Sequence, residues 1–242
     1  MEVITSLENK KVKELSKLLM KKYRDESNLF LVEGEHLVLE ALKNNVLLET
    51  LMTEDYGMVY DVKNTFVTYD IIKKLSTTLS PQKVIGVCKK IEEKEIGNKV
   101  LILDDIQDPG NLGTIIRSAV AFNFDTIILS SNTVDLYNDK VIRSSEGMLF
   151  NINIIKRDTL EVIEYLHIND YKIYGTRVDD GRSVNDANAP SRFACIVGNE
   201  GNGVRKEVLD MCDEYLYINM NNKCESLNVG VAASILMYEL GK

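Results

Sequence analysis

Strand-length apolar runs that alternate with helical segments constrain the fold of this chain most strongly, and they dominate it from residue 99 onward. The runs are KVLILDD, DTIILSS, INIIKR, KIYGTRV, FACIVGN and EYLYINM. Nearly continuous apolar strands separated by helices indicate a parallel sheet with helices on both faces. Ligands bind such sheets beyond the carboxyl ends of the strands. We therefore predict an α/β domain over 99–242 whose functional residues lie in the loops that follow its strands.

The first 92 residues predict a second, smaller α/β domain. A basic helix is expected over 7–22, because Val12, Leu15, Leu18 and Leu19 recur at helical spacing. The runs FLVEG, LETLMTE, TFVTYD and VIGVCKK read as strands, and two helices are expected, over 35–44 and near 70–75. The charged stretch 93–98 has little to bury and is predicted to be a linker.

Composition narrows the class of protein. The 242 residues are 45% hydrophobic and 27% charged, which is ordinary for a globular protein in water. No apolar run approaches the roughly 20 residues that a membrane helix needs, and no apolar signal core is present. Four widely spaced cysteines without a CxxC motif, and only two histidines, predict reduced thiols and neither disulfides nor a metal site. A cytoplasmic protein fits these features.

The charge distribution leaves two interpretations of the N-terminal helix open. A net charge of −8 argues against a general nucleic-acid coat. Residues 1–24, however, hold seven Lys/Arg and three Glu. This helix either contacts RNA phosphates or presents a solvated charged face.

Three loops that follow predicted strands share small residues, polar side chains and free backbone N–H donors. They are DPGNLGTIIRS (108–118), VGNEGNGVRKEV (197–208) and NMNNKCESLNVGVAAS (219–234). Taken singly, each has a structural explanation: Gly110 and Gly113 allow a tight turn, Glu200 accepts loop N–H bonds, and Ser226 caps a helix with Asn228 just inside it. The phosphate-binding loop and the dinucleotide fingerprint are both absent from the sequence.

Taken together, NLGTIIRSA, VGNEGNGV and ESLNVGVAAS resemble the three motifs of the SpoU/TrmH family of RNA ribose 2′-O-methyltransferases, within the SPOUT class. FLVEGEHLVLEAL resembles the N-terminal substrate-binding module of that family, a small ribosomal-protein-like α/β domain. The resemblance implies a deep C-terminal trefoil knot, a homodimer through the C-terminal domain, and S-adenosyl-L-methionine as cofactor. The substrate would be RNA, most plausibly ribosomal RNA.

The resemblance also assigns residues to roles. Asn111, Arg117, Glu200, Ser226 and Asn228 would form the catalytic set. Backbone groups near the cofactor would come from Thr176, Gly198, Ile218 and Leu227. RNA contacts in the N-terminal domain would come from Lys10, Lys11, Lys13, Arg24 and Glu33.

Arg117 is expected to clamp the phosphate beside the reacting ribose and to stabilise the developing alkoxide. Arginine has a pKa above about 12, so it makes a poor general base. The proton of the 2′-hydroxyl would leave through phosphate or water.

Two departures from the family pattern and three alternatives remain open. Asn219-Met220-Asn221-Asn222 stands where Pro-Met-x-Gly is frequent, and Asn222 is expected to preserve the turn with a positive φ. Glu146 either repels RNA or pairs with Arg143. The alternatives to a ribosomal RNA enzyme are a tRNA methyltransferase, a non-catalytic RNA-binding module and a small-molecule nucleotide enzyme.

Overall fold

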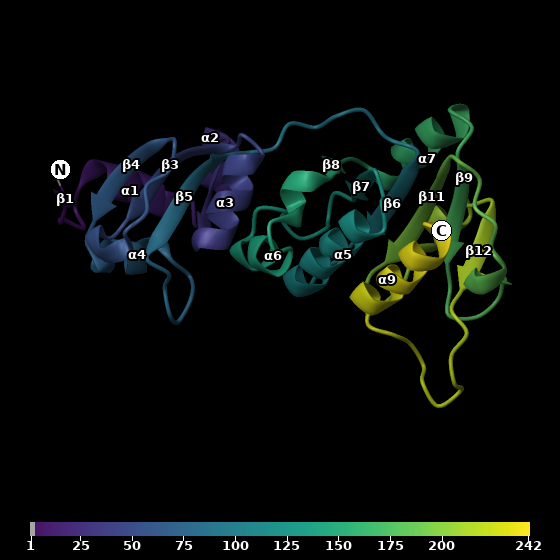
Figure 1. Ribbon diagram of the computed structural model, residues 1–242. Coiled ribbons are helices and arrows are strands. Elements are labelled where there is room, and N and C mark those ends of the chain that lie inside the picture. Colours follow the sequence, from purple (N-terminus) through teal and green to yellow (C-terminus); the bar gives the residue numbers. More distant parts are fainter. Residues whose placement is uncertain (1–2) are drawn as a thin grey trace. The chain divides into compact units, whose positions relative to one another are not determined.

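The computed structural model describes residues 3–242 as two compact units (Figure 1). One unit comprises the chain up to Glu92 together with Asp135–Phe150, and the other comprises Glu93–Val134 and Asn151–Lys242. The chain thus passes from the first unit to the second just before the predicted linker. Residues 135–150, which the sequence placed in the C-terminal domain, cluster with the first unit. Within the described range, none of the helices has the length and apolar character to span a membrane.

The first unit is built on a mixed five-stranded sheet. The strands, in spatial order, are β1 (Val3–Ile4), β4 (Lys63–Val67), β3 (Leu47–Met52), β5 (Val84–Lys89) and β2 (Leu29–Glu33). β4 pairs in parallel with both β1 and β3, whereas β5 is antiparallel to both β3 and β2. The helices are α1 (Lys10–Lys17), α2 (Lys21–Ser27), α3 (Glu35–Lys43), α4 (Tyr69–Leu75) and α6 (Asp139–Ser144), with 3-10 turns η1 (Glu54–Tyr56) and η2 (Met148–Asn151).

The two faces of this sheet are covered by different helices because side chains alternate along β5. Ile85 and Val87 belong to a buried cluster with side chains of α1 and α4. Gly86, between them, faces α3: a Cβ atom there would come within 3.3 Å of Val38 and closer still to Leu47. Strand alternation therefore places α1 and α4 on one face and α3 on the other.

The predicted single helix over 7–22 was wrong, because the chain forms two helices there. α1 ends at Lys17, and Met20 has an extended backbone with φ −104° and ψ 133° before α2 begins. The Arg24 guanidinium donates to the Leu18 carbonyl oxygen at 2.7 Å. A side chain six residues away thus binds a carbonyl at the end of the first helix, a tertiary contact that apolar periodicity does not report.

The chain over 139–150 is not one continuous helix, because a turn separates α6 from η2. α6 ends at Ser144, and Glu146 and Gly147 have φ values of 51° and 76°, in the left-handed region. A Cβ atom at Gly147 would lie 2.9 Å from the Glu40 side chain, so the turn brings this backbone directly against α3. Arg143 pairs with Asp139 at 2.7 Å rather than with Glu146.

The second unit is built on a parallel sheet, as the sequence predicted, and the sheet has the six expected strands and the short strand β10 in addition. The strands, in spatial order, are β10 (Arg182–Ser183), β12 (Glu214–Tyr217), β9 (Lys172–Thr176), β11 (Phe193–Gly198), β6 (Lys99–Asp104), β7 (Thr126–Leu129) and β8 (Asn153–Lys156). Every pairing in the sheet is parallel. The order of the strands reverses at β6, where β7 and β8 continue to one side and β11 and β9 lie on the other. Such a switch point is where ligands bind in open parallel sheets.

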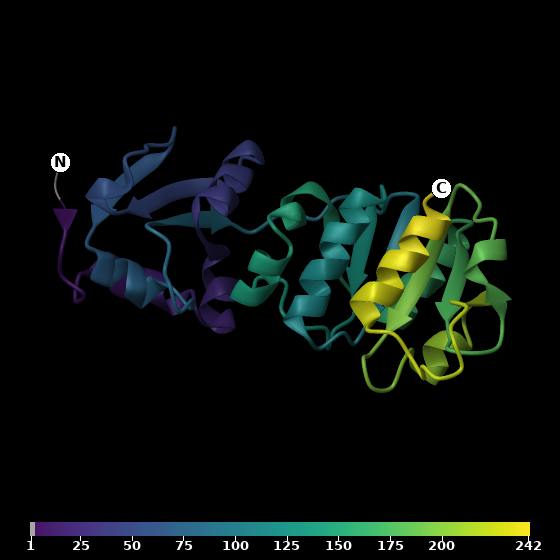
Figure 2. The ribbon, with the colours of Figure 1, turned by 60° about the horizontal axis from the view of Figure 1, so that its bottom comes forward.

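Helices flank both faces of this sheet, and two of them carry the predicted motifs. α5 (Pro109–Ala121) and α9 (Val229–Leu240) lie side by side on one face (Figures 1 and 2), where the Ser118 and Ser234 hydroxyls are hydrogen-bonded at 2.8 Å. α7 (Thr159–Ile168) and α8 (Lys206–Leu209) pack against the other face. The remaining turn is η3 (Val184–Asp186).

Candidate active site at the carboxyl edge of the sheet

A cavity of about 410 Å³ opens beyond the carboxyl ends of β9, β11 and β12. Its walls come from the segments that follow these strands and from the first turns of α9. The four predicted cofactor residues and two of the predicted catalytic residues all line it, namely Thr176, Gly198, Glu200, Ile218, Ser226 and Leu227. This volume lies within the range of small-molecule and cofactor sites.

Close backbone approach forms the wall that follows β11. A Cβ atom at Gly198 would lie 2.1 Å from the carbonyl carbon of Gly203 and from the nitrogen of Val204, so only glycine fits there. Asn199 and Gly203 exchange two backbone hydrogen bonds, of 3.0 and 2.9 Å. Gly203 adopts φ 69°, a conformation that glycine reaches without strain. Residues 198–204 therefore form a closed loop that folds back on its own root.

Asn111 from the first motif is hydrogen-bonded to both Glu200 from the second and Asn228 from the third. The Asn111 side-chain amide donates to Glu200 Oε1 at 3.0 Å, and the Asn228 amide donates to Asn111 Oδ1 at 2.9 Å. Asn228 Oδ1 in turn accepts the N–H groups of Gly230 and Val231 at the start of α9. Segments about ninety and more than a hundred residues apart thus meet in one continuous network.

Glu200 fixes the direction of this network because an ionised carboxylate only accepts hydrogen bonds. Its oxygens also accept the backbone N–H groups of Gln107 and Asp108, at 3.1 and 3.0 Å. The Asn111 NH₂ group must therefore face Glu200, which leaves its carbonyl oxygen facing Asn228. The orientation of both amides follows from one negative charge.

The electrostatics keep Glu200 ionised. Partial burial by itself raises the pKa of Glu200, but hydrogen bonds from the Asp108 N–H, the Asn111 amide and loop N–H groups outweigh it and lower this pKa below its ordinary value of 4.5. A carboxylate with a depressed pKa is a weak proton acceptor at neutral pH. Glu200 is therefore suited to holding Asn111 in place and unsuited to removing a proton.

The sequence interpretation of the first motif needs a correction. Gly110 and Gly113 do not form a loop turn, because α5 already begins at Pro109 and both glycines are helical. Asp108 is the N-cap residue and accepts the Asn111 N–H at 2.9 Å, and proline occupies the first helical position. The change of chain direction occurs earlier, at Asp105, which has φ 63°.

Arg117 stands on the exposed face of α5 that also carries Asn111 and Thr114, at helical spacing of three residues. Its side chain makes no hydrogen bond or ion pair with any residue in the range 3–242. The guanidinium is thus exposed and able to receive an anionic group.

The third motif differs from the sequence prediction in two details. Asn228, and not Ser226, is the N-cap residue of α9, and Ser226 lies exposed in the preceding loop along the cavity. Asn222 is not among the residues with positive φ. The chain is instead held at Asn219, whose side-chain amide donates to the Ser183 hydroxyl at 2.9 Å.

Asn199 is a structural contributor that the sequence analysis missed. Its Oδ1 accepts the N–H groups of Gly201 and Asn202, and its Nδ2 donates to the Asp105 carbonyl oxygen at 2.9 Å. The available signal was an asparagine at a strand end followed by glycines, which favours a side-chain-supported turn.

The predicted RNA-contacting residues of the first unit already have partners in the protein. Lys10 and Lys13 pair with Glu14 and Glu8, and Lys11 pairs with Glu49 from β3. The Lys10 and Lys13 pairs lie on the surface and are weak, so an RNA phosphate could displace them. Glu49 is largely buried, and Lys11 also donates to the Thr65 hydroxyl at 3.0 Å, so Lys11 is held more firmly. RNA binding by the three lysines stays a prediction.

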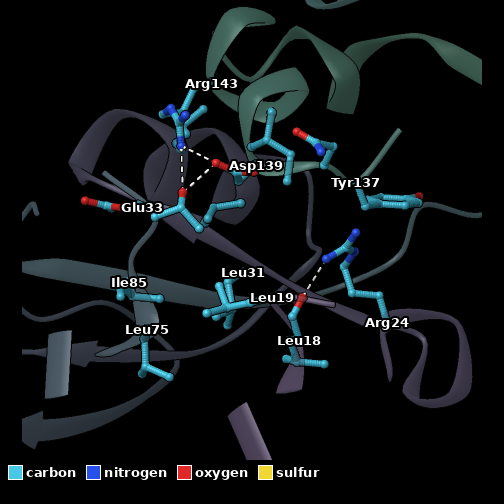
Figure 3. A pocket seen from close by; sticks show the side chains of 15 residues that line it. Leu18, Leu19, Arg24, Leu31, Glu33, Leu75, Ile85, Tyr137, Asp139 and Arg143 are labelled. Atoms are coloured by element: carbon cyan, nitrogen blue, oxygen red, sulfur yellow. Dashed lines mark hydrogen bonds and ion pairs between the residues drawn. The ribbon is translucent and has the colours of Figure 1, made fainter. Parts of the chain in front are cut away.

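Arg24 and Glu33 line a separate hollow of about 60 Å³ within the first unit (Figure 3). Arg24 is 7% exposed and pairs with Asp135 at 2.6 Å, which excludes it as a surface contact in this conformation. Both oxygens of Glu33 accept hydrogen bonds, from Ser76, Thr78 and the Gln82 N–H. Glu33 thus fixes the loop 76–82. The hollow has room for about four water molecules.

Comparison with known proteins identifies the class to which this fold and site belong. Residues 98–238 match the model of the SpoU rRNA Methylase family, and residues 9–86 match the MRM3-like substrate binding domain. The chain therefore belongs to the SpoU rRNA methylase family.

Individual relatives match this chain over nearly its full length, and solved structures share its fold. The chain is 40% identical to the 23S rRNA (guanosine(2553)-2′-O)-methyltransferase RlmP of Bacillus subtilis, covering 99% of both chains. Its structure is similar to that of an AdoMet-bound rRNA methyltransferase from Sinorhizobium meliloti, with a TM-score of 0.87, 26% identity, and coverage of 98% of this chain and 96% of that one. An RNA methyltransferase structure of the TrmH family from Porphyromonas gingivalis also gives a TM-score of 0.87, at 29% identity and coverage of 97% and 98%.

Proposed function

We propose that this chain is an S-adenosylmethionine-dependent enzyme that methylates a ribose 2′-hydroxyl of ribosomal RNA. The observation that carries the proposal is the Asn111–Glu200–Asn228 network, which joins all three family motifs beside a cofactor-sized cavity. The full-length similarity to a 23S rRNA 2′-O-methyltransferase supports ribosomal RNA over tRNA. An N-terminal part that matches a substrate binding domain supports an RNA substrate.

The residues around the cavity fit S-adenosylmethionine. Gly198 lines the cavity and lets the 198–204 loop close against the strand end, which shapes a main-chain wall for a flat adenine edge. The apolar side chains of Ile218 and Leu227 offer surface for its ring. Thr176 donates its hydroxyl to the Ile196 carbonyl oxygen at 2.8 Å, which leaves its backbone groups as the contacts on that side. When bound, the cofactor supplies an activated methyl group on a positively charged sulfur.

The chemistry requires the ribose oxygen to lie in line with that methyl group. Holding two reactants in this geometry can contribute about 7–11 kcal/mol to lowering the barrier. With S-adenosylmethionine bound, the ribose 2′-oxygen would accept the activated methyl group that the cofactor supplies, and the hydroxyl proton would leave to phosphate or water. Arg117, whose side chain has no hydrogen-bond or ion-pair partner within the described residues, would clamp the neighbouring phosphate and stabilise the negative charge that develops on the oxygen.

The polar network positions the substrate side of this reaction. Glu200 holds Asn111, and Asn111 accepts from Asn228 at the first turn of α9. The remaining amide hydrogens of both asparagines are the donors that we assign to the ribose. Ser226, exposed along the cavity, is assigned to the loop or to a water molecule at the reaction centre.

The architecture of the proposed enzyme follows the family. Residues 1–92 would bind the RNA substrate, 93–98 would connect, and 99–242 would form the methyltransferase domain with a deep trefoil knot. The position of β11 between β6 and β9, and the closed loop 198–204, are compatible with such threading. We further propose a homodimer through the C-terminal domain and a cytoplasmic location, where ribosomal RNA is available.

The decisive experiment incubates the protein with tritiated S-adenosylmethionine and total RNA that lacks the modification, and then maps the labelled nucleotide. Label on a ribose of 23S rRNA is the expected result. Label confined to tRNA would show that tRNA is the substrate. A protein that binds RNA but transfers no label would be a non-catalytic RNA-binding module.

A further inference from the structure

Asp104, which no motif assignment includes, is a fully buried carboxylate at the carboxyl end of β6. It accepts four hydrogen bonds from Arg205: from the backbone N–H at 3.1 Å, from Nε at 3.0 and 3.1 Å, and from Nη2 at 2.7 Å. The Thr159 hydroxyl donates a further bond at 3.3 Å. Two parallel charged hydrogen bonds make a pair of this kind directional as well as strong.

The pair fixes the loop that forms one wall of the cavity. Asp104 lies opposite Gly198 in the register of β6 and β11, so it stands beside the residue at which the loop begins. Arg205 directly follows Val204, at which the loop ends. The Asp104 carboxylate therefore lies beside Gly198, the first residue of the loop, and binds Arg205, the residue just after the loop.

Neither partner belongs to the cavity wall itself. The residues of this segment that line the cavity run from Val197 to Val204, and neither Asp104 nor Arg205 is among the lining residues. The Arg205 side chain is about one third exposed, and its Nη1 lies 3.4 Å from Glu207, on the side of α8. Any effect of the pair on a bound ligand must therefore pass through the position of the loop.

We propose that Asp104 and Arg205 are positioning residues that set the affinity of the cavity for the cofactor by holding the 198–204 loop against the end of β6. This inference rests on the proposed cofactor role of the cavity. A backbone wall can recognise a nucleoside only at a fixed distance from it, and the Asp104–Arg205 pair holds the two ends of this loop at the end of β6. Cofactor binding should depend on the pair, whereas RNA binding and the chemical step at saturating cofactor should not. Glu200 belongs to this loop but is held separately by the Gln107 and Asp108 N–H groups and the Asn111 amide.

The test uses Arg205→Lys, which keeps the charge and the backbone N–H but loses the two-pronged geometry. Asp104→Asn is the second variant, since it keeps the shape and one acceptor oxygen. Arg157→Lys is the matched control, because Arg157 pairs with Glu93 at 2.7 Å on the surface of the same unit. Ile127→Ala, in the buried core of β7, controls for a general loss of stability.

Calorimetric titration with S-adenosylhomocysteine and steady-state kinetics give the readout. We expect Arg205→Lys to raise the Kd for S-adenosylhomocysteine and the KM for cofactor by about tenfold or more, with kcat at saturating cofactor and RNA affinity within about twofold of wild type. Arg157→Lys and Ile127→Ala should leave the Kd unchanged.

The outcomes separate this inference from the proposed function. A folded Arg205→Lys protein with wild-type Kd would overturn the inference, and so would a fall in kcat at saturating cofactor without a change in Kd. If Ile127→Ala raises the Kd as much as the pair variants do, the role is merely structural and the inference also fails. A wild-type protein that binds no S-adenosylhomocysteine would refute the proposed function itself.

Discussion

Replacing Glu200 by glutamine tests whether a single carboxylate orients the hydrogen-bond network of Asn111, Glu200 and Asn228. The wild-type side chain accepts three hydrogen bonds, from the Gln107 N–H, the Asp108 N–H and the Asn111 amide. Glutamine keeps one acceptor oxygen and places an NH₂ group where the other stood. If the remaining oxygen serves Asp108 and Asn111, the new NH₂ group opposes the Gln107 N–H.

The size of the expected loss of stability follows from the number of hydrogen bonds that Glu200→Gln removes. A hydrogen bond to a charged group contributes about 1.5–3 kcal/mol, and solvent screening at this exposed position favours the lower end. We therefore expect the free energy of unfolding to fall by about 1–2 kcal/mol, which lowers the Tm by about 2–8 °C for a chain of this size. Because Asn111 loses its charged partner, kcat should fall about 10- to 100-fold, the range seen when supporting residues are removed.

The pH dependence gives an independent check. The folded pKa of Glu200 lies below its ordinary value of 4.5, so its contribution to stability is present above that value and is lost as pH falls through the folded pKa. The difference in unfolding free energy between wild type and Glu200→Gln should thus be constant near neutral pH and shrink in acid. Glu164→Gln, an exposed change on α7, is the control and should alter neither stability nor kcat.

The assays are chemical denaturation at several pH values and single-turnover methyl transfer. A Glu200→Gln enzyme with wild-type kcat would refute the claim that the carboxylate orients Asn111. The wild-type activity could instead fall with a titration near neutral pH, and this pH dependence could be absent from Glu200→Gln. That result would make Glu200 a proton carrier.

Three further predictions concern other parts of the protein. Arg117→Lys should lower kcat at least about tenfold with little change in S-adenosylhomocysteine affinity, since lysine cannot clamp a phosphate with two prongs; near-wild-type turnover would contradict this clamp. Reversing the charges at Lys10, Lys11 and Lys13 should weaken RNA binding and flatten its salt dependence in filter-binding assays, whereas unchanged affinity would return this helix to a solvated face. Tyr238→Arg on α9, where the tyrosine is 53% exposed, should convert the proposed homodimer to a monomer in light scattering, and an unchanged mass would exclude this face from the proposed contact.

The sequence predicted the structure best where the apolar pattern of a segment agrees with the place of that segment in the fold. The apolar runs after residue 99 predicted the parallel sheet, because a strand buried on both faces has no polar side to display. The three motifs were also correctly expected at the carboxyl edge, where parallel strands direct their following loops to one place. Similarity in motif order was enough to indicate the family.

The sequence was misleading where a distant residue decides a local structure. Apolar spacing continued through Leu18 and Leu19, but Arg24 binds the Leu18 carbonyl group and a second helix begins at Lys21. Ser226 and Asn228 are both good N-cap residues, so propensity could not choose between them. In the structure Asn228 is the N-cap residue of α9, and its side-chain amide also donates to Asn111 Oδ1.

The amino-acid sequence by itself determined the class of fold and the family and pointed to the residues of the three motifs, because periodicity and motif order are properties of the chain. Only the tertiary structure decided what those residues do to one another. The carboxylate of Glu200 turns the Asn111 amide, and Asp104 neighbours one end of a loop and binds the residue that follows the other. Hydrogen bonds depend on distance and direction between atoms that the chain brings together only when it folds, about a hundred residues apart in both cases.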